Sequence, residues 1–336
     1  MAGSMLSIVI PAYNEADNIG ETLAELIACL EDCLPAAAGG QFEIIVVDDH
    51  SDDGTFQAVE GASDPRVACI RLSRRCGSHT ALRAGLKQAS GDAVICVSAD
   101  GQDNSAALPA MLARWRAGAH IVWALRQTRE DERGLQRLFS GWFYKLLQRM
   151  ADSGANQSAT VDLSRADFYL LDRRVVDAVN GCPERNTSLF GLIAWSGFRQ
   201  EAVEYVRRPR RHGQPKWSFG SRFRLAKDWI IAFSGLPLRL MTIFGFVVAA
   251  FGFLYAVVLF FRAFYGEPLP GWSSLMVVVL VLGGLQAAML GVIGEYLWRT
   301  LDEARNRGLY FIETSTFERR KIMDDRHSAP PRDDAE

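Results

Sequence analysis

The sequence predicts an α/β fold: a mostly parallel, Rossmann-like sheet with helices on both faces, followed by an interfacial amphipathic helix and a two-helix transmembrane hairpin. Two observations support this prediction. Over residues 5–125, short runs rich in β-branched residues alternate with helical patterns, as in consecutive βαβ units. Late in the 336-residue chain, the composition changes to two long apolar runs.

Five short apolar runs are the predicted strands of the sheet. They cover residues 6–13, 42–49, 67–73, 93–100 and 120–125. Helical patterns lie between them, most clearly over 16–34 and 77–90. Strands that alternate with helices in this way pair in parallel, because each helix carries the chain back across the sheet.

Acidic and turn-forming residues follow three of these strands. They are Asn14 and Glu15, then Asp48, Asp49, Asp52 and Asp53, then Asp100 and Asp103. The carboxyl ends of parallel strands meet at one edge of the sheet, where open α/β folds bind their ligands. We therefore expect a ligand crevice at this edge.

The ligand expected in this crevice is a nucleotide-sugar. No G-x-G-x-x-G or Walker A pattern is present, which argues against a dinucleotide oxidoreductase or an NTPase. Carboxylates at strand ends suit hydrogen bonds to a base or ribose, and they suit a divalent ion that neutralises a pyrophosphate.

The formal net charge of -2 gives no global sign of nucleic-acid binding. Six cysteines without C-x-x-C spacing predict reduced thiols, and the start of the chain predicts no secretory signal.

The two apolar runs, about 240–261 and 274–298, are the predicted transmembrane helices. Each has about twenty residues, enough to cross a hydrocarbon core of about 30 Å. Lys and Arg gather before the first run and after the second, while the connecting loop has only Arg262. This asymmetry predicts an integral membrane protein with both termini and the N-terminal domain in the cytoplasm.

The patterns divide the chain into four parts. Residues 1–218 form the cytoplasmic α/β domain, 219–236 an amphipathic helix that lies on the membrane, 237–300 the two spans and 301–336 a cytoplasmic tail. The assignment of 219–236 rests on apolar residues at helical spacing opposite Arg222, Arg224 and Lys227.

Five motifs, in order along the chain, resemble those of a known enzyme family. "IPAYNE" at 10–15, "VVDDHSDDGT" at 46–55 and "SADGQD" at 98–103 resemble the nucleotide and metal motifs of family 2 inverting glycosyltransferases with the GT-A fold. The segments 197–218 and 291–312 resemble the branch that acts on polyprenyl phosphates, namely dolichyl-phosphate mannose synthases and bactoprenol glucosyltransferases. The resemblance covers nearly the whole chain.

The resemblance implies roles for individual residues. The implied nucleotide-sugar contacts are Pro11, Tyr13, Glu15, Asp48, Asp49, Arg126 and Arg129. The implied ligands of Mg²⁺ or Mn²⁺ are Asp100 and Gln102, and the implied catalytic residues are Asp100 and Asp167. The implied lipid-phosphate contacts are Arg208, Arg211 and Lys216. For two of these groups an alternative stays open: Arg129 equally fits a solvated charge run, and the basic segment equally fits attraction to anionic lipid.

The resemblance implies transfer of a sugar from a UDP- or GDP-sugar to a polyprenyl phosphate, with inversion, at the cytoplasmic membrane face. The implied partners are these two substrates and the membrane, without nucleic acid, and a homo-oligomer is compatible with them. Ser98 and Ser164 stand where relatives carry carboxylates. These two departures motivate an alternative, a catalytically inactive membrane scaffold, against which the retained Asp100, Gln102 and basic segment argue. A processive polysaccharide synthase is a weaker alternative, because the chain has no Gln-x-x-Arg-Trp-like segment.

Overall fold

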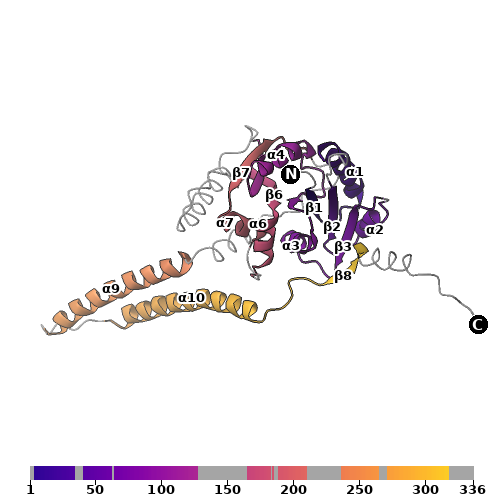
Figure 1. Cartoon of the computed structure of the whole chain (residues 1–336). Coiled ribbons are helices and arrows are strands. Elements are labelled where there is room, and N and C mark those ends of the chain that lie inside the picture. The colour runs from indigo at the N-terminus through magenta and orange to yellow at the C-terminus, as the bar shows by residue number, and fades with distance from the viewer. Residues whose placement is uncertain are drawn as a thin grey trace, which may run out of the picture. The chain divides into compact units, whose positions relative to one another are not determined.

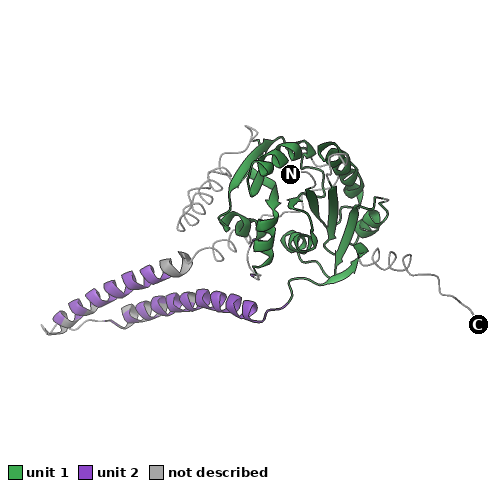
Figure 2. Ribbon diagram, viewed as in Figure 1, with its two compact units in different colours: residues 1–183, 189–216, 308–336 green, residues 184–188, 217–307 purple. Residues whose placement is uncertain are grey.

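The computed structural model describes residues 4–34, 41–62, 64–127, 165–182, 184, 188–209, 236–264 and 271–317. The chain forms two compact units, coloured green and purple in Figure 2. The first unit holds the sheet and its covering helices, and it takes in residues from 308 onward. The second unit holds the two long apolar helices.

An eight-stranded sheet forms the centre of the first unit, in the order β7-β5-β6-β4-β1-β2-β3-β8 (Figure 1). The strands are β1 (Met5–Ala12), β2 (Gln41–Asp48), β3 (Val67–Leu72), β4 (Ala93–Cys96), β5 (Ile121–Arg126), β6 (Ala166–Asp172), β7 (Gln200–Tyr205) and β8 (Ile312–Ser315). Neighbouring strands from β4 to β3 pair in parallel, as do β5 and β7. Two strands run the other way: β6, between β4 and β5, and β8, beside β3. The predicted mostly parallel sheet is confirmed.

Helices cover both faces of the sheet, as predicted. They are α1 (Ala16–Cys33), α2 (Thr55–Glu60), α3 (Ser78–Gln88), α4 (Leu108–Arg116), α6 (Arg173–Asn180) and α7 (Leu189–Trp195), with a short 3₁₀ helix η2 (Ser105–Ala107) before α4. Alternate residues of β1 enter different cores: Ile8 and Ile10 pack with α1 and α4, and Val9 packs with α3 and α6. Helix α3 approaches β1 so closely that a Cβ on Gly85 would collide with Val9.

The strand β8 corrects one part of the predicted division of the chain. Residues 301–336 were expected to form a tail, yet β8 pairs antiparallel with β3, with Arg71 opposite Thr314. The Thr316 hydroxyl also accepts a hydrogen bond from the Cys69 amide at 2.8 Å. A four-residue strand at the edge of a sheet is half exposed, so it carries little of the apolar signal that reveals a strand in a sequence.

The second unit is built on two long helices, α9 (Leu236–Phe264) and α10 (Trp272–Ala304), which contain the predicted spans. Their stretches Met241–Leu259 and Val281–Ala304 have mean hydropathies of 2.4 and 1.3, so both helices are long and apolar enough to cross a membrane. They pack against each other where a Cβ on Gly245 would lie 3.4 Å from the Met289 methyl group. The predicted amphipathic helix lies outside the described residues, apart from Leu236.

Candidate active site

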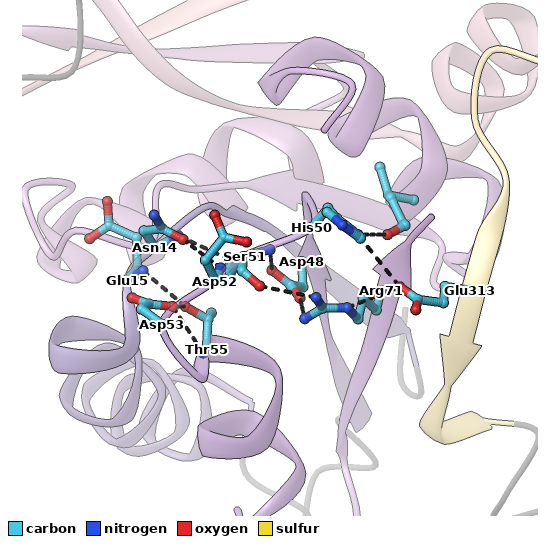
Figure 3. Close-up of polar contacts among 11 residues, drawn as sticks. Asn14, Glu15, Asp48, His50, Ser51, Asp52, Asp53, Thr55, Arg71 and Glu313 are labelled. Carbon is cyan, nitrogen blue, oxygen red and sulfur yellow. Dashed lines mark hydrogen bonds and ion pairs between the residues drawn. The ribbon is translucent and has the colours of Figure 1, made fainter. Parts of the chain in front are cut away.

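The loops that follow β1 and β2 are joined to each other by hydrogen bonds (Figure 3). The parallel register sets Ala12 beside Asp48, so both loops start at the same edge of the sheet. The Asn14 amide donates to the Ser51 hydroxyl at 2.9 Å, and the Asn14 side-chain oxygen accepts from the Asp52 amide at 2.9 Å. Asn14 has a φ of 52°, in the left-handed region that asparagine tolerates better than most residues. The two loops therefore form one crosslinked platform.

Asp53 anchors this platform to the starts of two helices. Its carboxylate accepts from the Ala16 amide at 3.1 Å, at the start of α1. It also accepts from the amide and hydroxyl of Thr55, at 3.1 and 2.5 Å, at the start of α2. Although partial burial acts to raise it, these hydrogen bonds lower the pKa of Asp53 below its ordinary value.

Asp48 lies wholly buried at the end of β2 and is neutralised by Arg71. One carboxylate oxygen accepts from the Ser51 amide at 3.0 Å, and the other is 2.9 Å from a guanidinium nitrogen of Arg71 (Figure 3). Arg71 also donates to the Ser51 carbonyl at 3.0 Å and to Glu313 of β8 at 3.1 Å. The predicted contact of Asp48 with a base or ribose stays a prediction.

Asp49 connects the platform to the start of α3. Its two carboxylate oxygens accept from the amides of Cys76 and Gly77, at 2.6 and 2.8 Å. Burial raises the pKa of Asp49 above its ordinary value, while these amides and Arg75 oppose the rise. Each carboxylate oxygen has a second lone pair, so the geometry is compatible with the predicted contact to a base or ribose.

The other predicted nucleotide contacts from "IPAYNE" lie at this same edge. Pro11 is next to the end of β1, and Tyr13 follows it with its ring 3.9 Å from the guanidinium carbon of Arg75. Glu15 is buried, and its carboxylate accepts from the Asn18 side-chain amide at 2.7 Å. Their roles toward a nucleotide stay predictions.

A second group of polar residues follows β4. The Ser98 hydroxyl donates to Asp100 at 2.8 Å, and the Gln102 amide donates to the same oxygen of Asp100 at 3.2 Å. The Ser98 amide donates to Asp103 at 2.6 Å. Burial, with a smaller contribution from the Asp100 and Asp167 carboxylates, raises the pKa of Asp103 to about 6. Ser98 stands where relatives carry a carboxylate. Its hydroxyl orients Asp100, the residue that the resemblance implies as both a metal ligand and a catalytic residue.

Asp167 of β6 lies between two arginines and a tyrosine. It accepts from the Tyr205 hydroxyl at 2.6 Å, and its other oxygen is 3.4 Å from Arg207 and 3.8 Å from Arg126. Arg207 also donates to the Gln102 side-chain oxygen at 2.8 Å. The structure therefore brings together Asp167, Gln102 and Arg126, three residues that the sequence singles out.

Sequence reasoning missed two members of this group, Arg207 and Tyr205. The signal for Arg207 was present, since it starts the basic segment and directly precedes Arg208. Nothing local in the sequence marks Tyr205, because its partner Asp167 lies on a different strand. Burial and the nearby carboxylates of Asp103 and Asp167 raise the pKa of Tyr205, so its phenol stays a hydrogen-bond donor at neutral pH.

Arg208 lies beside this group, on the segment that follows β7. Its guanidinium donates to Glu25 of α1 at 2.6 Å, and its amide donates to the Gln102 carbonyl at 3.1 Å. Among the other predicted site residues, Arg129, Arg211 and Lys216 lie outside the described residues, as does Ser164.

The donor atoms after β4 fit a hard divalent cation. Over the described ranges, no group of three or more His, Cys, Asp or Glu side chains is arranged to hold a metal ion. Magnesium sites that also bind a substrate phosphate often use only one or two carboxylates, with water and phosphate oxygens completing the shell. Asp100 supplies one carboxylate, and Gln102, two residues later, supplies a side-chain amide oxygen that also accepts from Arg207.

Known proteins resemble this chain over most of its length. Residues 7–167 match the model for Glycosyl transferase family 2. The chain is 38% identical over 310 residues to the uncharacterized glycosyltransferase sll0501 of Synechocystis sp., which is 91% of this chain and 94% of the relative. It is 35% identical over 313 residues to the bactoprenol glucosyl transferase of Shigella phage SfII, which is 92% of this chain and 98% of the relative. Among solved structures, glucosyl-3-phosphoglycerate synthase from Mycobacterium tuberculosis aligns with a TM-score of 0.47 and 18% identity over 69% of this chain and 81% of that protein.

Proposed function

The chain belongs to glycosyl transferase family 2, and from this premise we propose that it transfers a sugar from a UDP- or GDP-sugar to a polyprenyl phosphate, with inversion, at the cytoplasmic membrane face. The observation that carries the proposal is the extent of the match to the bactoprenol glucosyl transferase of Shigella phage SfII. That match spans 92% of the chain, so it includes both apolar helices as well as the sheet. A soluble acceptor would give no reason to keep two such helices.

The donor nucleotide is assigned to the platform after β1 and β2. Pro11, Tyr13 and Glu15 contact the nucleotide, while Asp48 and Asp49 accept hydrogen bonds from base or ribose. The crosslinks between the loops support this assignment, because a site held by its own hydrogen bonds loses little conformational freedom when a ligand binds.

The diphosphate and its metal are assigned to the group after β4. Asp100 and Gln102 hold Mg²⁺ or Mn²⁺, and Arg126 and Arg129 bind phosphate oxygens through charge-assisted hydrogen bonds. When bound, the ion neutralises the charge that develops on the leaving diphosphate. Asp100 is already oriented by Ser98, which supports its assignment as the main ligand.

The acceptor phosphate is assigned to the basic segment, with Arg208, Arg211 and Lys216 as its contacts. A phosphomonoester has a second pKa of about 6, so at neutral pH the nucleophile is largely a dianion. It attacks the anomeric carbon without first losing a proton, and the site needs no general base. Asp167 then acts by holding Arg207 and Tyr205, and a serine at position 164 is compatible with turnover.

A transfer assay tests the proposed function. Purified full-length protein, undecaprenyl phosphate, Mg²⁺ and a panel of radiolabelled UDP- and GDP-sugars should yield label in the organic phase with one donor, and no label without the lipid phosphate. Absence of transfer from every donor, with nucleotide still protecting the protein against thermal unfolding, would favour the inactive-scaffold alternative.

The membrane topology is a part of the proposal that can be tested separately. Basic residues before α9 and after α10 support a cytoplasmic sheet domain and cytoplasmic termini. Reporters fused after Glu336 should be active only when they function in the cytoplasm. Activity of a reporter that requires export would contradict this arrangement.

A further inference from the structure

Arg71 connects two carboxylates that lie at opposite ends of the chain. Its three guanidinium nitrogens each have a different partner (Figure 3). One nitrogen donates to Asp48 at 2.9 Å, a second to the Ser51 carbonyl at 3.0 Å and the third to Glu313 at 3.1 Å. Three hydrogen bonds fix the guanidinium in one orientation, whereas an arginine with a single partner can rotate about that bond.

Glu313 reaches this arginine because β8 completes the sheet. Thr314 lies opposite Arg71 in the antiparallel register, which brings the neighbouring Glu313 side chain to the carboxyl end of β3. His50 contacts the same carboxylate, with its Nδ1 at 3.5 Å from Glu313 and 3.1 Å from the Leu72 carbonyl. His50 itself has a φ of 60°, so the loop after β2 makes its sharp turn at this contact.

The contacts of Arg71 continue into the platform. Ser51, whose carbonyl Arg71 holds, receives the Asn14 amide on its hydroxyl and gives its own amide to Asp48. Asn14 stands between Tyr13 and Glu15 in the sequence. A shift of the Arg71 side chain would therefore move both loops that are assigned to the donor nucleotide.

We propose that Glu313 is a positioning residue of the donor site, which raises the affinity for the donor nucleotide by holding Arg71 on Asp48 and Ser51 without touching the nucleotide. The proposal rests on the proposed function, because it takes the platform as the place where the nucleotide binds. Strand β8, which follows α10 in the sequence, then contributes to nucleotide binding through Glu313.

A second ion pair at the other end of β3 provides a matched control. Arg66 directly precedes β3 and lies 2.7 Å from Glu31 of α1. The exposed fractions of the Glu31 and Glu313 side chains are similar, 56% and 49%. Glu31→Gln and Glu313→Gln each remove one contact between an arginine and a partly exposed carboxylate. Of these two carboxylates, Glu313 is the one whose arginine also bonds to the platform, at the Ser51 carbonyl.

The experiment compares Glu313→Gln and Glu31→Gln in the full-length protein. The dissociation constants of UDP and GDP are measured by calorimetry with Mg²⁺, together with the KM for undecaprenyl phosphate and the thermal midpoint without ligand. Loss of a partly exposed charged contact predicts that Glu313→Gln weakens binding of the preferred nucleotide about three- to tenfold. The lipid KM and the thermal midpoint should stay close to wild type, and Glu31→Gln should bind nucleotide like wild type.

A double variant tests whether Glu313 acts through Arg71. If it does, Arg71→Lys with Glu313→Gln should bind nucleotide no more weakly than Arg71→Lys alone, because the fork that Glu313 orients is already gone. Additive losses would overturn the proposal, as would wild-type affinity in Glu313→Gln or an equal loss in Glu31→Gln. If wild type bound neither UDP nor GDP, the donor-site assignment itself would be wrong and this inference would be overturned with it.

Discussion

The two polar groups at the carboxyl edge of the sheet are held together in different ways. After β1 and β2, side chains such as Asp49 and Asp53 bond mainly to backbone amides and hydroxyls, at 2.5 to 3.1 Å. Around Asp167, the contacts with Arg207 and Arg126 are longer, 3.4 and 3.8 Å, and join side chains to each other. The first group is held mainly through the backbone, whereas the second is joined through side chains, which include Tyr205 on Asp167 at 2.6 Å and Arg207 on Gln102 at 2.8 Å. This difference is consistent with the proposal that the first group binds the donor nucleotide and the second binds its diphosphate.

The largest effect is expected at Asp100, in the second group. Asp100→Asn removes the negative charge that would hold the cation, and the leaving diphosphate then lacks neutralisation. Transfer should fall by at least about a hundredfold while the thermal midpoint stays near that of wild type. Steady-state transfer assays and thermal unfolding measure both. Asp32→Asn, which changes an exposed carboxylate near the end of α1, is the control and should transfer normally. Near-normal transfer by Asp100→Asn would remove the second group from the chemistry.

A smaller loss is expected when Asp167 is changed. Asp167→Asn keeps the shape of the side chain but weakens its hold on Arg126 and Arg207, so the groups around the substrates are misplaced. We expect kcat to fall roughly ten- to a hundredfold, with a smaller rise in the dissociation constant of the nucleotide, because Arg126 is assigned to the phosphates of the donor. Asp177→Asn, which removes an exposed charge 3.7 Å from Arg173 on α6, is the control. An effect on nucleotide affinity alone would place Asp167 with the first group.

The smallest effect is expected at Asp53, in the first group, and it concerns stability. Asp53→Asn loses part of the bonding to Ala16 and Thr55, which should lower the free energy of unfolding by about 1 kcal/mol at pH 7. Because the side chain is largely exposed, its charge adds little beyond these bonds.

The effect of Asp53→Asn should depend on pH in a defined direction. The folded pKa lies below the unfolded value of about 3.9, so the stability from Asp53 is present above that value and is lost as pH falls through the folded pKa. The difference from wild type should therefore shrink below about pH 4 in denaturant titrations. A difference that grew on acidification would contradict the assigned bonding.

The sequence predicted the sheet better than it predicted its edges. Continuous apolar runs such as the one before Asp48 mark buried strands, and these were found where expected. Strand β6 is equally apolar at Phe168 to Leu171, but it runs antiparallel between β4 and β5. The alternation of strand and helix patterns along the sequence does not reveal the direction of such a strand. Strand β8 was missed because its pairing with β3 depends on residues far away in the sequence.

The site could be predicted to the level of its strand ends, and no further. The acidic clusters correctly placed Asp48, Asp49 and Asp100 at strand ends, which can be read from hydrophobic runs and turn residues, while their roles toward a ligand stay predictions. Their partners Arg71, Tyr205 and Glu313 come from other strands, and no local pattern connects them. Those partners show how the fold holds each carboxylate: Asp48, for example, is paired with Arg71 at 2.9 Å.

The most direct test of the account asks whether the nucleophile is the lipid phosphate. Transfer to undecaprenyl phosphate and to undecaprenol is measured against pH, for wild type and for Ser164→Ala. The account predicts transfer to the phosphate alone, with a rate that rises through the acceptor's second pKa of about 6 and then levels off, and with little loss in the variant. Transfer to the alcohol, a rate limit that follows a protein group after the acceptor is fully ionised, or a large loss in Ser164→Ala would contradict it.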